Sequence, residues 1–195
     1  MTRAPAHRAV GVLWCGTART GRSNGWAFPP AVARHLREMT AGKRVCHLFG
    51  GLATFGCRCD IDATVRPDVL SDAWLPPFVQ DAFDVVILDP PYYNINQQMK
   101  NQLLRGAAFI AKDSVIWFHT MWIDADICLT LRRSWLVRVG DMCSVRVVQE
   151  FAVRPGEKAK PRSHFTRGPA IRYNRWLAGQ MGLPYRHESG DRSAT

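Results

Sequence analysis

The hydrophobic residues of this chain fall in short runs, most of which end at a glycine or an acidic residue. Such runs occupy residues 45–49, 57–61, 68–72, 83–88 and 115–119. Apolar runs of about four to eight residues are typical of strands that are covered on both faces, as in a parallel sheet. The pattern therefore predicts five buried strands, of which 83–88 is the strongest.

Other segments have the spacing of helices or of a hairpin. Apolar residues recur at helical intervals over 31–39, directly after two prolines, and proline is favoured at a helix start. Residues 96–111 and 123–133 are also predicted to be helical. Residues 135–139 and 144–153 alternate between apolar and polar positions, which predicts an antiparallel hairpin.

The order of these elements predicts an α/β fold with an open, mostly parallel sheet and a C-terminal antiparallel hairpin. Residues 1–26 and 154–195 are rich in Gly, Pro and Arg and are predicted to be irregular, apart from a short helix near 172–180. We therefore divide the chain into a basic N-terminal arm (1–26), one α/β domain (27–153) and a basic C-terminal tail (154–195).

Positive charge concentrates at the two ends of the chain. The net charge is +7 over residues 1–44, −3 over 45–150 and +6 over 151–195, which gives +10 in total. Basic ends around a mildly acidic centre suit a protein whose ends hold a polyanion such as a nucleic acid. A solubilising surface with a disordered tail explains these charges equally well.

Composition argues against a membrane protein and against a metal centre. No apolar run approaches the roughly 20 residues that cross a bilayer, and the N-terminus has no apolar leader, so we expect a cytoplasmic protein. The six cysteines form no paired C-x2-C motifs, so we expect no metal site. Buried thiols in a reducing compartment are the simpler interpretation.

Glycines and carboxylates follow the predicted strands at their carboxyl ends, where open α/β sheets bind ligands. Gly50 and Gly51 follow the first run, and glycine lets the backbone approach a ligand closely. Asp60 follows the second run and is our first candidate for accepting the hydroxyls of a ribose. Asp62 is the second candidate, with a turn or a helix cap as its alternative role.

Asp72 ends the third run and is a candidate acceptor for an adenine amino group, with Ala73 and Trp74 as an apolar wall. The full G-x-G-x-x-G fingerprint is absent from the chain, so a nicotinamide dinucleotide is not expected. Because these side chains follow strands of one sheet, we expect them to converge on a single crevice.

The motif Asp89-Pro90-Pro91-Tyr92 directly follows the strongest predicted strand. Two prolines keep the backbone extended and, because they lack N–H groups, leave carbonyls free to accept hydrogen bonds. The lone pair of a nucleobase amino group is delocalised into the ring, which makes this nitrogen a weak nucleophile. A carboxylate and a carbonyl that accept its hydrogens would make it more nucleophilic, and Tyr92 would stack on the base, a contact worth roughly 1–3 kcal/mol.

In this setting the motif resembles the catalytic motif of the amino-methyltransferases that act on nucleic acids, most of all the N6-adenine DNA methyltransferases. The resemblance covers about residues 27–153. It implies a Rossmann-like class I methyltransferase fold with S-adenosylmethionine (AdoMet) as the cofactor. The catalytic residues that it implies are Asp89, Pro90, Pro91 and Tyr92.

The same resemblance assigns residues to the cofactor. Residues 45–51, which end in Phe49, Gly50 and Gly51, resemble the first AdoMet motif of the family. Asp60 and Asp72 match its ribose and adenine carboxylates. Phe28 and Pro29, with Pro30, resemble the segment that brackets the methionine end of AdoMet.

The chain departs from the family between its first two strands. Only about eight residues separate them, and the usual glycine motif is replaced by residues 49–56, so the intervening helix is shortened or absent. No large target-recognition domain is visible either. Recognition is therefore expected from the basic arm, the loop at 93–101 and the tail.

Candidate substrate contacts lie in that loop and at the end of the fifth run. The loop begins with Tyr93 and Asn94 and is rich in amides, which pair bidentately with adenine; a polar loop that opens a helix is an equally good interpretation. His119 falls where the family has a strand end near the target base. A histidine satisfied by a backbone carbonyl is the alternative there.

The sequence thus predicts methyl transfer from AdoMet to an exocyclic amino nitrogen of a nucleobase, most of all adenine N6 in DNA, with the base flipped out of its stack. The first alternative is an RNA enzyme that methylates an adenine or guanine amino group. A nucleic-acid-binding protein that keeps the fold without the cofactor is the second, and an amino-methyltransferase of small molecules or protein glutamine is the third. The recognition sequence and the oligomeric state are left open.

Overall fold

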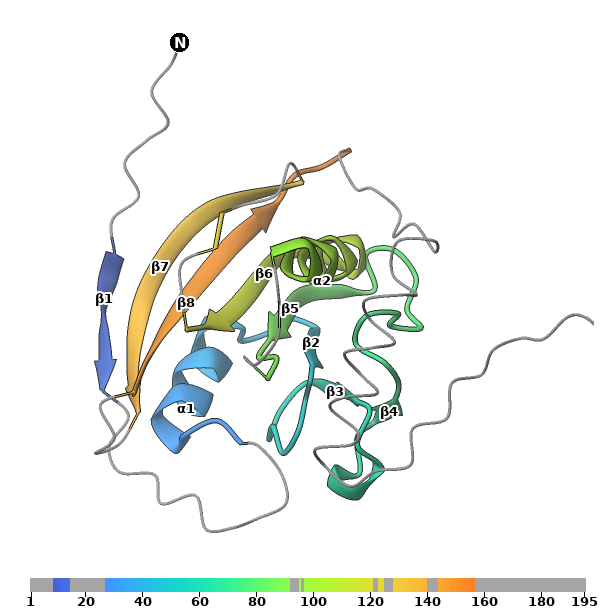
Figure 1. Cartoon of the computed structure of the whole chain (residues 1–195), viewed down its shortest axis with the longest axis horizontal. Helices are drawn as coiled ribbons and strands as arrows, with labels where there is room; N and C mark the ends of the chain where they lie inside the picture. The colour runs from blue at the N-terminus through green and yellow to red at the C-terminus, as the bar shows by residue number, and fades with distance from the viewer. Residues whose placement is uncertain are drawn as a thin grey trace, which may run out of the picture.

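The computed structural model describes residues 9–14, 27–91, 95, 97–120, 123–124, 128–139 and 144–156. Within them, eight strands form one sheet in the order β1-β7-β8-β6-β5-β2-β3-β4 (Figure 1). The strands are β1 (Ala9–Trp14), β2 (Val45–Leu48), β3 (Cys57–Asp60), β4 (Val69–Leu70), β5 (Phe83–Leu88), β6 (Ala111–His119), β7 (Leu129–Val139) and β8 (Ser144–Val153). The helices are α1 (Pro30–Met39), α2 (Gln97–Ile110) and the 3-10 helix η1 (Ala63–Val65).

Neighbouring strands of this sheet are parallel, except at β8. Strand β8 runs antiparallel to both β6 and β7, and β7 and β8 pair along their whole length. The other neighbouring pairs, from β1·β7 to β3·β4, are parallel. The predicted α/β fold, with a mostly parallel sheet and a C-terminal antiparallel hairpin, is confirmed.

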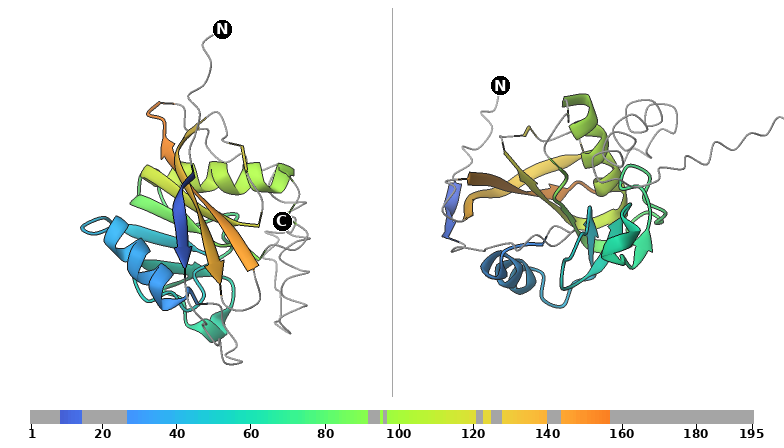
Figure 2. Two further views of the ribbon diagram at one scale, coloured as in Figure 1. Left: turned by 90° about the vertical axis from the view of Figure 1, so that its left-hand side faces the viewer. Right: turned by 60° about the horizontal axis from the view of Figure 1, so that its bottom comes forward.

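Helices α1 and α2 cover opposite faces of the sheet (Figure 2), which we call the α1 face and the α2 face. The core on the α2 face is the larger and includes Trp117 and Phe151 with the inner side of α2. The core on the α1 face includes Ile87 and Phe118 with the inner side of α1. Burial of the central strands on both faces explains why their sequences are continuous apolar runs.

Helix α1 forms where its sequence favours both of its ends. Pro30 is the first helical residue, where a missing N–H costs nothing, and the Pro29 carbonyl accepts the Ala33 N–H at 2.9 Å. The helix buries Val32 and Leu36 against the sheet. It ends at Thr40, whose hydroxyl donates to the Leu36 carbonyl at 2.8 Å.

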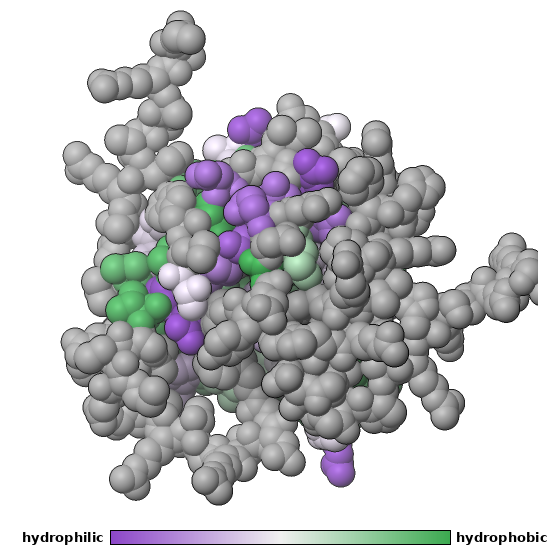
Figure 3. All heavy atoms as spheres, viewed as in Figure 1, coloured by the Kyte–Doolittle hydropathy of each residue, from purple (hydrophilic) through white to green (hydrophobic). Residues whose placement is uncertain are grey.

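Helix α2 has one apolar side and one polar side. Leu103 and Leu104 are fully buried, and each such burial contributes about 1.5–3 kcal/mol. Gln97 and Arg105 lie on the exposed side. In the space-filling view, hydrophilic surface gathers over the region of α2 (Figure 3).

Two elements differ from those predicted. Residues 1–26 were expected to be irregular, but Ala9–Trp14 forms β1 and pairs with β7. The predicted helix at 123–133 was wrong over its second half, because Leu129–Val139 is the long strand β7. The register of β7 against β8 shifts between Leu131 and Arg133, and this bulge interrupts the two-residue alternation that identifies a strand.

Smaller differences concern element length and coverage. The third predicted strand, 68–72, is reduced to the two residues of β4. The helix expected near 172–180 lies outside the described residues. Among the residues that the structure describes, no helix has the length and apolar character needed to cross a membrane.

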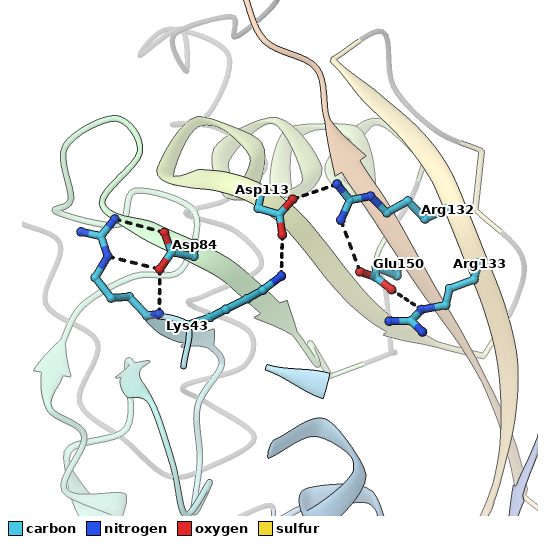
Figure 4. Close-up of polar contacts among 7 residues, drawn as sticks. Lys43, Asp84, Asp113, Arg132, Arg133 and Glu150 are labelled. Carbon is cyan, nitrogen blue, oxygen red and sulfur yellow. Dashed lines mark hydrogen bonds and ion pairs between the residues drawn. The ribbon is translucent and has the colours of Figure 1, made fainter. Parts of the chain in front are cut away.

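A network of ion pairs fastens the amino ends of the parallel strands (Figure 4). Asp113 at the start of β6 pairs with Lys43 at 2.6 Å and with Arg132 of β7 at 2.8 Å. Glu150 of β8 is buried and pairs with Arg132 at 3.7 Å and with Arg133. These contacts lie at the opposite end of the strands from the candidate site.

The link between β2 and β3 has only eight residues, 49–56, and contains no helix. Adjacent parallel strands are usually joined by a crossover of a dozen or more residues, most often a helix. Here the link covers the α1 face of β2 itself, since the Phe55 ring lies edge-on against His47 with centroids 4.7 Å apart. The helix between these strands, which was expected to be shortened or absent, is absent.

Candidate active site

The carboxyl ends of β3, β2, β5 and β6 lie side by side at one edge of the sheet. Cys59, Leu48, Leu88 and Trp117 are register partners across these strands. The residues that come next, Asp60, Phe49, Asp89 and Phe118, therefore lie side by side on neighbouring strands, which are about 4.8 Å apart. Phe49 and Asp89 are the first residues after β2 and β5, whereas Asp60 and Phe118 still belong to β3 and β6. The structure thus brings the glycine turn and the Asp-Pro-Pro motif together.

The turn after β2 requires an unusual backbone. Phe49 has a φ of 63° and Gly51 a φ of 47°, both in the left-handed region. A Cβ on Gly50 would lie 2.8 Å from the Cβ of Arg58, so only glycine fits against β3 at this point. A non-glycine residue such as Phe49 in this region is strained, and such strain is concentrated at ligand sites.

Asp60 holds this turn in place. Its Oδ2 accepts the Gly51 N–H at 2.7 Å, and its Oδ1 accepts the Asp62 N–H at 3.0 Å. Burial raises the pKa of the Asp60 carboxyl, and these backbone N–H groups oppose the rise. A carboxylate has about four acceptor positions, so two N–H bonds leave capacity for the hydroxyls of a ligand.

Asp62 is buried and bonded within its own loop. Its Oδ1 accepts both the N–H of Thr64, at 2.8 Å, and the Thr64 hydroxyl, at 2.7 Å. The side chain caps the amino end of η1 in this way. This is the alternative role, that of a cap, predicted for Asp62, and Asp60 is the carboxylate that contacts the glycine turn.

Asp72 and Ala73 lie just after β4. The Asp72 Oδ1 accepts the Trp74 N–H at 2.9 Å, and Ala73 and Trp74 are buried in the core of the α2 face. Burial raises the pKa of the Cys59 thiol to about 12, and the nearby Asp60 and Asp72 carboxylates add to the rise. Asp60 and Asp72, the two carboxylates predicted to bind the cofactor, therefore both lie near the Cys59 thiol.

The Asp-Pro-Pro motif is held between β5 and α2. Asp89 is 7% exposed, Pro90 is buried and Pro91 is half-buried. After the motif, Ile95 and Met99 are buried and pack into the core of the α2 face. Tyr92, Tyr93 and Asn94 lie outside the described residues, so their predicted roles stay predictions.

Phe28 and His119 approach the same edge from different elements. The Phe28 ring packs on Phe118 of β6, with centroids 4.9 Å apart, and lies 5.9 Å from the His47 ring of β2. Phe28 thus spans the strand ends on either side of Asp89, next to Pro29 at the start of α1. His119 is 2% exposed and lies 6.0 Å from the Trp117 ring.

The structure also identifies residues near the site that the sequence analysis did not select. His47 lies inside an apolar strand, and Lys100 is 4% exposed in the first turn of α2. Lys100 precedes Leu103, Leu104 and Ala107 at helical spacing, so a lysine on the apolar side of the helix was the signal available. Arg58 contacts the glycine turn through its guanidinium and is treated below.

Comparison with known proteins identifies the fold. No protein-family model and no curated protein matches the chain. TrmN from Thermus thermophilus matches with a TM-score of 0.52 and 17% identity, over 68% of this chain and 50% of TrmN. The magnesium protoporphyrin IX methyltransferase ChlM from Synechocystis PCC 6803, solved with bound SAM, gives 0.48 and 11%, over 64% of this chain and 77% of ChlM.

This chain therefore spans half the length of TrmN. At this level of identity the match establishes architecture alone. The chain has the class I methyltransferase fold, as the resemblance of its sequence implied.

The close contact at Gly50 predicts opposite effects for two glycine substitutions. We expect Gly50→Ala to lower the free energy of unfolding by about 1–3 kcal/mol, because the new Cβ would collide with Arg58. Gly106→Ala, in open space within α2, should raise it by about 0.5–1 kcal/mol. Urea denaturation of both variants measures the difference, and equal midpoints for Gly50→Ala and wild type would contradict the packing described.

Burial of His47 predicts a loss of stability in mild acid. Burial lowers the pKa of His47 to about 4. The Arg58 charge also lowers this pKa, whereas a backbone hydrogen bond at Phe55 raises it in part. The unfolded chain takes up this proton near pH 6.5 and the folded chain does not, so stability falls as the pH drops from 6.5 toward 4. We expect wild type to lose roughly 1–2 kcal/mol between pH 7.5 and 5 relative to His47→Phe. Parallel pH dependences of the two proteins would show that His47 is not the titrating group.

Proposed function

We propose that this chain transfers a methyl group from AdoMet to an exocyclic amino nitrogen of a nucleobase, most of all adenine N6 in DNA. One observation carries the proposal. Asp89-Pro90-Pro91 leaves β5 beside the glycine turn that leaves β2, because Leu88 and Leu48 are register partners. A substrate motif and a cofactor turn on adjacent strands suit the transfer of a group between two ligands.

The residues around the glycine turn fit AdoMet. Gly50 packs directly against β3, which brings the turn close to Asp60, and Asp60 retains acceptor positions for ribose hydroxyls. Asp72 and Ala73, which follow β4, would bind the adenine of AdoMet. Phe28 and Pro29 would cover its methionine end. When bound, AdoMet supplies a methyl group already activated on a sulfonium.

The chemistry that remains for the protein is positioning of the amino nitrogen. The Asp89 carboxylate would accept one amino hydrogen and the Pro90 carbonyl the other, which localises the nitrogen lone pair toward the methyl group. Transfer would form the new N–C bond as the methyl–sulfur bond of the sulfonium breaks and a neutral thioether leaves, and Asp89 would accept the proton that the amino group loses. Tyr92 would stack on the base, and Tyr93, Asn94 and His119 would line its pocket.

A nucleic acid is the substrate class that suits the charge of the chain. Residues 1–44 and 151–195 carry the excess of lysine and arginine, while the segment that contains the carboxylates of the site is mildly acidic. Phosphate contacts from the ends would hold the strand, and the flipped base would enter the pocket. We favour DNA, and an RNA base is the alternative that the first assay separates.

Replacement of Asp89 should abolish methyl transfer and leave cofactor binding intact. We expect Asp89→Ala to reduce turnover by at least about 100-fold, because the carboxylate acts on the base amino group. Asp84→Asn is the matched control, since Asp84 lies at the other end of β5 and is bonded to Arg44. The measurement is transfer of labelled methyl from AdoMet to duplex DNA, single-stranded DNA and total RNA.

Calorimetry with AdoMet on the same proteins completes this test. Turnover by Asp89→Ala near that of wild type would contradict the mechanism. Product on RNA and on neither form of DNA would retain the chemistry and move the substrate to the RNA alternative. Absence of both AdoMet binding and product in the wild type would favour the cofactor-free binding protein.

Expression in a host without adenine methylation of its own tests the proposed product directly. We expect N6-methyladenine to accumulate in the host DNA at one recurrent sequence with wild type and not with Asp89→Ala. Modification-sensitive sequencing measures both the modified base and its context. Unmodified DNA from cells that contain folded, AdoMet-binding protein would exclude DNA adenine as the substrate in that host.

A further inference from the structure

The turn after β2 lacks the crossover helix that joins adjacent strands in most parallel α/β sheets. In dinucleotide-binding folds the helix after the first strand presents its amino end to the ligand and packs on the sheet. Here residues 49–56 form no helix, and the turn is held at Gly50 by two backbone bonds, from the Ala53 N–H to the Gly50 carbonyl at 2.9 Å and from the Gly50 N–H to the Cys59 carbonyl at 3.0 Å. Neither of these bonds involves Gly51, whose backbone groups are bonded by side chains of β3.

The Arg58 side chain makes contacts on both sides of this link. Its Nη1 donates to the Gly51 carbonyl at 3.4 Å and to the Val65 carbonyl at 3.2 Å, and its Nη2 donates to the Arg66 carbonyl at 2.5 Å. Its Nε pairs with the Asp68 carboxylate at 3.4 Å. One guanidinium thus ties the turn after β2 to the loop after β3.

Both backbone polar groups of Gly51 are bonded by side chains of β3. Its N–H donates to Asp60, and its carbonyl accepts from Arg58. Residues two apart in a strand point to the same face of the sheet, so Arg58 and Asp60 act on the turn from one side. The backbone of Arg58 also lies against Gly50, where a Cβ would approach its Cα to 3.0 Å.

We propose that Arg58 is a positioning residue for the cofactor: its guanidinium fixes the Gly50–Gly51 turn in the geometry that binds AdoMet. The inference rests on the proposed function, because it concerns the affinity for AdoMet. Arg58 itself need not touch the ligand. Its planar group with five donors bonds three carbonyls and a carboxylate at once, which the single ammonium of a lysine does not reproduce.

The test is AdoMet binding by Arg58→Lys, measured by calorimetry at a temperature where thermal denaturation shows the variant to be folded. We expect the Kd for AdoMet to rise about 10–100-fold, the range that corresponds to losing hydrogen bonds to a charged group. Turnover at saturating AdoMet and the KM for the nucleic acid should stay close to those of wild type. A residue that only stabilised the fold would lower Tm and leave the Kd unchanged.

Arg44→Lys is the matched control. The Arg44 guanidinium pairs with the Asp84 carboxylate at 3.3 Å and donates to the Asp81 carbonyl at 3.5 Å. The backbone N–H of Arg44 also donates to the Asp84 carboxylate, at 2.8 Å. These contacts reproduce the kind of site that Arg58 occupies, at the other end of the strands. We expect Arg44→Lys to bind AdoMet with the wild-type Kd.

Asp68→Asn keeps the test decisive if Arg58→Lys does not fold. Asp68 is about half exposed, and its substitution weakens one anchor of Arg58 without removing the guanidinium. A Kd for AdoMet that rises by about 2–10-fold in this variant supports the inference, since one hydrogen bond is weakened. Wild-type affinity in every folded variant at Arg58 and Asp68 would overturn it while the proposed function stands. Failure of the wild type to bind AdoMet would overturn both.

Discussion

The direct link between β2 and β3 is the constraint on which the geometry of the site depends. Eight residues must turn at the carboxyl end of β2 and return to the amino end of β3. This short path forces the left-handed backbone at Phe49 and Gly51 and the contact of Gly50 with Arg58. It also lays Phe55 over His47, so the link supplies the cover that a helix supplies in other parallel sheets.

The two ends of the strands are stabilised by different interactions. At the amino ends, side chains of opposite charge pair with one another, as Asp113 does with Lys43 and Arg132. At the carboxyl ends, Asp62 and Asp72 accept backbone N–H groups of their own loops, and Asp60 accepts one from its own loop and one from the turn after β2. A carboxylate bonded to backbone N–H groups has a fixed direction and keeps part of its acceptor capacity, which suits ligand binding. The charged network fixes the sheet without drawing on the groups of the site.

The sequence predicted those parts of the structure whose cause lies in local pattern. The strand at 83–88 matches β5 residue for residue, because an apolar run before Asp-Pro-Pro has few other structures open to it. Asp60 and Asp89 were identified from their places after strands. By contrast, a bulge interrupted the alternation in β7, and the apolar run of β1, AVGVLW, lies inside a segment that is otherwise rich in Gly, Ser, Thr and Arg. The role of Arg58 could not be read from the sequence, since three of its partners are the backbone carbonyls of residues 51, 65 and 66 and only Asp68 contributes a side chain.

The distribution of helices then has a physical reason. Between β2 and β5 no connection contains an α-helix. The link from β2 to β3 is irregular, that from β3 to β4 contains only the three residues of η1, and that from β4 to β5 is irregular again. Bonds from side chains to the backbone stabilise these loops. Between β5 and β6 the chain keeps the full helix α2, of 14 residues. The Asp-Pro-Pro motif has no N–H on its prolines and cannot be fixed by backbone donors of its own. It needs buried structure on both sides, and β5 before it with Ile95 and Met99 after it provide that. The long helix is retained where the motif itself offers the fewest hydrogen bonds.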